Sequence, residues 1–273
     1  YLSMLMANTP LILMEYKMAD YKTWLSDLTN WLKDVKDHEV KALSEFLMAQ
    51  QIKTTIICYV RDPLSWVVSA SQEMAKNGGG TPNLDNFFKS RLQKYIKHFG
   101  KENIKVFDYQ KSSLSEQSIV RHFSRVLSIN LKELPKTNES LNPLQFSLIQ
   151  NLNNINLKKK RHHSWDIIVS KIIKIGSMSS LYSGKKLDKQ YFKNLIPDSI
   201  EEDCNWLNNQ FGIRYKINYR SEQKNIDRYH KLILSNSSEA AENLFREIGI
   251  KYNPILNLQD NFLNAYIFIE TGI

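Results

Sequence analysis

The chain has little cysteine and no long apolar run. Only two of its 273 residues are cysteines, Cys58 and Cys204, and they lie far apart in the sequence. A disulfide framework is therefore not expected, and a reducing, cytoplasmic compartment is the default expectation. No apolar stretch is long enough to span a bilayer and no charged-then-apolar leader is visible, so we expect no membrane span.

A glycine-rich phosphate loop is also missing from this sequence. Residues 77–82 contain three consecutive glycines, but no Lys-Ser or Lys-Thr pair follows them. The pattern before these glycines predicts a helix, whereas a phosphate loop follows a strand. We therefore interpret residues 77–82 as a connection that flanks a site.

The most informative stretch is residues 54–69. Its first seven residues are β-branched, apolar and uncharged, which predicts a buried strand. Asp62 suits a helix N-cap and Pro63 suits the first helical position, so a helix is expected to about residue 76. Arg61 then stands at the carboxyl end of a strand, where open α/β sheets bind ligands. Ser69 follows roughly 10 Å along the helix, so both side chains can hold one anion.

The remaining elements alternate in type. Strands are predicted at residues 10–15 and 103–109, and helices at 20–36, 38–51, 83–98, 118–127 and 143–151, with a closing helical region at 191–211. Asn83 is expected to cap the third of these helices and Gly100 to end it. The order strand, helices, strand, helix is a βαβ pattern and predicts a parallel sheet.

Arg61-Asp62-Pro63 followed by Ser69 resembles the motif with which sulfotransferases hold the 3′-phosphate of the sulfate donor PAPS. Later segments add to the resemblance in the same order: residues 99–106, 138–143 and 205–213. It covers about residues 10–213 and is similar to the bacterial carbohydrate type. It implies a P-loop-NTPase-like parallel sheet flanked by helices over residues 1–213, with residues 214–273 as an appendage of unknown role.

The resemblance also implies an activity. A sulfotransferase moves a sulfuryl group from PAPS to a hydroxyl or amine of a carbohydrate-type acceptor and releases PAP. Arg61 and Ser69 would hold the donor 3′-phosphate, and Glu15, at the end of the first strand, would be the candidate general base. The family often has two serines before this glutamate, whereas Leu13 and Met14 occupy those positions here. An exposed strand-end carboxylate is the competing interpretation of Glu15.

The chain departs from the family in its lack of the phosphate loop that binds the 5′-phosphosulfate. The alignment places that loop upstream of Tyr1, and the start at a residue other than Met favours an omitted segment. The alternative is a catalytically silent module of sulfotransferase-like fold that binds an anionic glycan or a protein partner.

The net charge of +9 suits anionic ligands but does not choose among them. The densest basic run, residues 158–163, is either an exposed helix end or a groove for a polyanionic glycan or for the donor's phosphates. His162, His163 and Asp166 have no evident further ligand, so no metal site is predicted. Residues 214–231 interleave basic and aromatic side chains, but no nucleic-acid recognition motif accompanies them.

Overall fold

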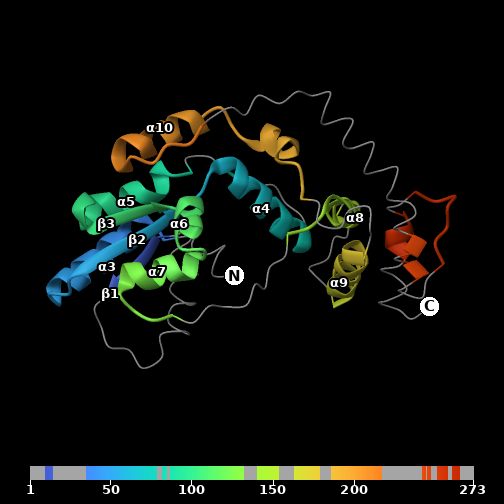
Figure 1. The fold of residues 1–273 in the computed structure, drawn as a ribbon, viewed down its shortest axis with the longest axis horizontal. Coiled ribbons are helices and arrows are strands. Elements are labelled where there is room, and N and C mark those ends of the chain that lie inside the picture. The colour runs from blue at the N-terminus through green and yellow to red at the C-terminus, as the bar shows by residue number, and fades with distance from the viewer. Residues whose placement is uncertain are drawn as a thin grey trace. The chain divides into compact units, whose positions relative to one another are not determined.

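The computed structural model describes residues 10–14, 35–78, 82–84, 87–131, 140–153, 163–178, 186–216, 242–243, 245–246, 251–257 and 260–264. The protein is a mixed α/β chain that divides into two compact units (Figure 1). The first unit comprises residues 1–66, 83–138 and 197–217, and the second comprises the rest. The boundary falls inside helix α4 (Pro63–Lys76). Nowhere in the described ranges is a helix both long and apolar enough to cross a membrane.

The first unit is built on a three-stranded sheet in the order β1-β2-β3. The central strand is β2 (Thr54–Val60), and β3 (Ile104–Asp108) pairs with it in parallel, so that Val60 lies opposite Asp108. The β-branched residues of β2 fit a strand that is covered on both faces. Both strands were predicted within a residue or two of their observed ends.

The third strand, β1 (Pro10–Met14), pairs antiparallel with β2, with Pro10 opposite Cys58. The prediction that this strand runs parallel to β2 is therefore wrong, although its position in the sequence is confirmed. The direction of a strand depends on how many times the connection crosses the sheet, and residues 15–53 are long enough for either result. Apolar patterning reports burial and carries no such information.

Helices cover both faces of this sheet. Successive side chains of β2 point to opposite faces. Ile56 packs in a buried cluster with α3 (Asp37–Ala49) and α5 (Lys89–Phe99), while Ile57 and Tyr59 pack with α7 (Ile119–Leu127) on the other face. The first unit is thus a helix–sheet–helix arrangement, with the short helices η1 (Lys101–Asn103) and α6 (Tyr109–Ser115) at the two ends of β3.

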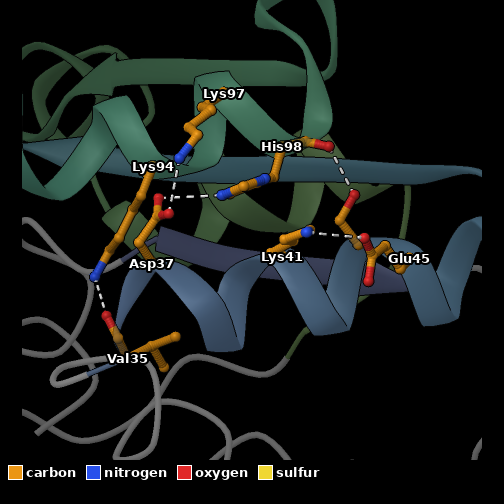
Figure 2. A network of polar contacts seen from close by, with 8 residues as sticks. Val35, Asp37, Lys41, Glu45, Lys94, Lys97 and His98 are labelled. Atoms are coloured by element: carbon orange, nitrogen blue, oxygen red, sulfur yellow. Dashed lines mark hydrogen bonds and ion pairs between the residues drawn. The ribbon is translucent and has the colours of Figure 1, made fainter.

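Polar contacts join α3 and the residues just before it to α5 (Figure 2). The Asp37 carboxylate accepts a hydrogen bond from Lys97 Nζ at 2.8 Å and lies 3.1 Å from His98 Nε2. These two neighbours hold the pKa of Asp37 below its ordinary value. Ser44 Oγ donates to the carbonyl of His98 at 2.6 Å, and Lys94 Nζ donates to the carbonyl of Val35. Because Asp37 and Lys97 are exposed, we attribute little stability to their ion pair.

The start of α5 is fixed by a residue from the end of the unit. The buried Asp203 carboxylate, on α10 (Ile200–Phe211), accepts hydrogen bonds from the backbone N–H groups of Phe88 and Lys89, the latter at 2.7 Å. The predicted helix start at Asn83 is therefore wrong: α5 begins at Lys89, where this distant carboxylate satisfies the first N–H groups. Gly100, with φ of 80°, ends the helix as predicted.

The second unit contains the rest of α4, α8 (Pro143–Asn153), α9 (His163–Met178) and η2 (Lys189–Leu195). Two side chains satisfy carbonyls at the end of α4: Asn153 Nδ2 donates to Ala75 and Trp165 Nε1 donates to Lys76. The fully buried residues of the second unit include several from α8 and α9: Leu148, Ile149, Leu152, Ile168 and Ile172. The sequence patterns did not predict helix α9.

We expect Asp203→Ala to lower the free energy of unfolding by about 2 to 3 kcal/mol, because the buried N–H of Phe88 and the partly buried N–H of Lys89 lose a charged acceptor. Urea unfolding measures this loss, and hydrogen exchange of residues 89–99 should rise with it. Glu202→Ala is the matched control, since Glu202 is exposed on the same turn of α10. Its cost should stay below about 1 kcal/mol. Equal effects of the two substitutions would contradict this role for Asp203.

Candidate functional site

The candidate site lies at the carboxyl edge of the parallel pair β2 and β3. Because Val60 lies opposite Asp108, the residues that leave the two strands are neighbours in space. Arg61 and Asp62 leave β2 and enter α4, while Tyr109 leaves β3 and begins α6. Two strand-to-helix junctions therefore lie side by side. They lie at the carboxyl ends of parallel strands, which is the edge where α/β sheets commonly bind ligands.

Arg61 is the cation of this edge. Its side chain is half-buried, and its guanidinium carbon lies 5.5 Å from the centroid of the Tyr109 ring. Burial lowers the pKa of Arg61, while Tyr109, Asp62 and Tyr215 raise it. An arginine with this shift still carries its charge at neutral pH. The sequence predicted Arg61 at a strand end and the structure places it there.

The two nearby carboxylates cap helices. Asp62 Oδ2 accepts the backbone N–H of Ser65 at 2.8 Å, which confirms the predicted N-cap of α4. Asp108 Oδ1 accepts the backbone N–H of Lys111 at 2.9 Å and caps α6 in the same way. Gln110 Nε2 donates to Ser65 Oγ at 3.2 Å and so connects the two junctions directly. These contacts fix the backbone on both sides of Arg61.

A segment from the end of the first unit completes the edge. Tyr215, four residues after α10, stacks on Phe88 with ring centroids 6.0 Å apart. Burial raises the pKa of Tyr215, and the nearby carboxylates of Asp108 and Asp62 raise it further. Tyr215 therefore stays protonated beside Arg61. The segment that carries it was predicted to begin the appendage, whereas the structure places residues 197–217 in the first unit.

The other predicted site residues are not brought to this edge by described contacts. Ser69 lies on α4 with a half-exposed side chain, but it belongs to the second unit while Arg61 belongs to the first. Their pairing on one phosphate stays a prediction. Glu15 and the basic residues 158–162 lie outside the described residues, and His163 begins α9 without a described side chain.

The sequence patterns did not predict Asp108, Tyr109 and Tyr215 as residues of the site. The first two had a usable signal: they end the next strand of a predicted parallel pair, and parallel strands bring their carboxyl ends to one edge. Tyr215 had no such signal in the sequence, because only tertiary packing brings residues 212–216 back to the sheet. Among the described residues, no three His, Cys, Asp or Glu side chains cluster closely enough to hold a metal ion.

A second polar pair lies inside the unit. The Tyr59 hydroxyl is 2.7 Å from His122 Nδ1, and both residues are buried between the sheet and α7. Burial raises the pKa of Tyr59, and burial together with Arg125 lowers the pKa of His122, against a smaller opposing effect of Glu116. Both groups are therefore neutral at pH 7. Because Phe107 and Phe123 enclose Tyr59, we assign this pair a structural role.

Neither cysteine is positioned to act as a nucleophile. Cys58 lies in β2 and Cys204 in α10, and both are free and buried. Burial raises the pKa of each thiol to about 12. Since the thiolate is the reactive form, both side chains are inert in the folded chain.

Comparison of the chain with protein-family models, with curated proteins and with solved structures found no match.

The buried His122 predicts a pH dependence of stability. Its pKa is lowered in the folded chain, so the unfolded chain binds more protons below about pH 6.5. The neutral imidazole contributes fully to the free energy of unfolding above that pH. This contribution is lost as the pH falls toward the pKa of His122 in the folded chain. We expect the urea midpoint to fall between pH 7.5 and 5.5 by more in the wild-type chain than in His122→Gln. Parallel pH profiles of the two proteins would contradict this prediction.

We expect neither thiol of the native chain to react with a water-soluble aromatic disulfide reagent at pH 8 within minutes. In urea both cysteines should react, because unfolding restores their solvent access and ordinary pKa values. Absorbance of the released thiolate measures both states, and Cys58→Ala and Cys204→Ala each reduce the unfolded count by one. Rapid labelling of the native chain would show that one of the two sites opens to solvent.

Proposed function

We propose that the chain is a PAPS-dependent sulfotransferase with a sulfotransferase-like, P-loop-related fold that acts on a hydroxyl or amine of a carbohydrate-type acceptor. In this proposal Arg61 and Ser69 hold the 3′-phosphate of the donor. The observation that carries it is Arg61, half-buried on Tyr109 at the junction of a parallel strand and a capped helix.

The chemistry of this edge suits a phosphate. A guanidinium offers several N–H donors in a fixed plane that matches phosphate oxygens. The first turn of α4 adds the positive end of a helix dipole next to Arg61. Ser69, two turns along the same helix, supplies a hydroxyl that can donate to a second phosphate oxygen.

The donor supplies an activated sulfuryl group whose sulfur–oxygen bond breaks as the acceptor oxygen or nitrogen bonds to sulfur in line. The role of this chain's residues is to fix the donor so that the sulfur faces the acceptor, which is an effect of orientation. Glu15 is the proposed base that takes the acceptor proton.

Calorimetric titration with PAP tests the proposal. We expect the wild-type chain to bind PAP and Arg61→Ala to bind it about 10- to 100-fold more weakly, because a charge-assisted hydrogen bond contributes about 1.5–3 kcal/mol. Ser69→Ala should bind PAP about 3- to 10-fold more weakly than the wild type, because a hydrogen bond from a neutral donor contributes less binding free energy.

The chain offers matched controls for both substitutions. Arg121→Ala removes an exposed arginine of α7, and Ser71→Ala removes a buried hydroxyl that has no hydrogen bond among the described residues. Ser71 follows Ser69 by two positions and so faces another side of α4. Both controls should bind PAP as the wild type does. No PAP binding by the wild type, or equal binding by Arg61→Ala, would overturn the proposal.

Activity separates the enzyme from the alternative. A chain that binds PAP through Arg61 and transfers sulfate from PAPS to an amino sugar or oligosaccharide is the proposed enzyme. PAP binding without transfer to a broad acceptor panel supports the catalytically silent module instead.

A further inference from the structure

Arg61 is held in a defined orientation before any ligand arrives. The register of β2 and β3 brings Tyr109 to Arg61, with the guanidinium carbon 5.5 Å from the ring centroid. This distance is within the range in which a cation is attracted to the face of an aromatic ring. The backbone on both sides is fixed as well, by the Asp62 cap on α4 and the Asp108 cap on α6.

Tyr109 is itself well anchored. It is the first residue of α6, directly after β3, and its neighbour Gln110 donates to Ser65 on the first turn of α4. The two junctions therefore cannot slide past each other without breaking this hydrogen bond. A ring in contact with the guanidinium limits the rotamers open to Arg61.

We infer that Tyr109 is a positioning residue for Arg61: its ring holds the guanidinium in the orientation in which that group binds an oxyanion ligand. The identity of the ligand as a 3′-phosphate rests on the proposed function, whereas the packing of Arg61 on Tyr109 does not. An arginine that loses its rotamer freedom on folding does not lose it again on binding, so the ring increases affinity through preorganisation.

Two other cations among the described residues of the unit also lie over rings, and one of them, Arg91, serves as an internal control. Arg91 is 5.2 Å from the Phe87 centroid and Lys94 is 5.6 Å from the Tyr95 centroid. Both are on α5 and neither follows a strand. Substitutions at Tyr109 should leave the signal of Arg91 unchanged, which separates a local effect on Arg61 from a general loosening of the unit.

The test observes the Nε–Hε signal of Arg61 by NMR in the full 273-residue chain and identifies it by its loss in Arg61→Lys. In the wild type we expect an aromatic ring-current shift and slower solvent exchange than for the exposed Arg121. Tyr109→Phe keeps the ring and should preserve both properties. Tyr109→Leu removes the ring and should abolish both, while the Arg91 signal stays in place.

Binding of PAP gives the second readout. Tyr109→Phe should stay within about two-fold of the wild type, and Tyr109→Leu should bind about 3- to 30-fold more weakly, the range expected for one cation–π contact. A purely structural role of Tyr109 would lower the urea midpoint of the leucine variant without moving the Arg61 signal.

The outcomes separate this inference from the proposed function. Failure of the wild type to bind PAP overturns the proposed function, while the expected NMR pattern would still support the packing. A wild-type Arg61 signal that exchanges as fast as that of Arg121 overturns the inference, even where the leucine variant does not fold. An unchanged Arg61 signal in a folded Tyr109→Leu variant overturns it as well.

Discussion

The candidate site depends on the parallel register of β2 and β3. With Val60 opposite Asp108, Arg61 meets Tyr109 and Ser65 meets Gln110. A slip of one residue would turn Ile57 and Tyr59 away from the α7 side and expose the wrong side chains to each helix layer. Both faces of β2 are buried, so burial fixes the register, and the register in turn fixes the edge.

A half-buried arginine has a cost that the fold must offset. Removing a guanidinium from water disfavours its charged form, as the lowered pKa of Arg61 records. Tyr109, Asp62 and Tyr215 offset part of this cost, but a leucine at the same position would need no such partners. Cation–ring contacts occur elsewhere in the unit, so the contact alone does not indicate function. What distinguishes Arg61 is that it also follows a parallel strand and precedes a capped helix.

Local patterns predicted the junction well, because its determinants are local. The β-branched run at residues 54–60, the Asp62 cap and Pro63 are adjacent in the sequence, and each has one favoured structure. The failures have the opposite origin. The direction of β1 depends on how the intervening chain crosses the sheet, and α5 begins where Asp203, more than a hundred residues away, accepts its first N–H groups. Tyr215 reaches the site through tertiary contacts, which include packing on Phe88 and the nearby Asp108 carboxylate. Contacts between residues distant in the sequence leave no periodicity to detect.

Strand β2 carries no charged side chain along its length. Along Thr54–Val60 the ionisable side chains are Cys58 and Tyr59, and burial raises the pKa of both, so each stays neutral. The side chains of Tyr59 and His122 form a hydrogen bond with each other inside the helix–sheet layer, where both are buried. Arg61 is the first residue after this neutral run that carries a charge, and it does so where the chain leaves the covered part of the sheet. A fold that keeps its central strand uncharged and then places a cation over an aromatic ring at the edge has separated its structural polar groups from the group for which we propose ligand binding.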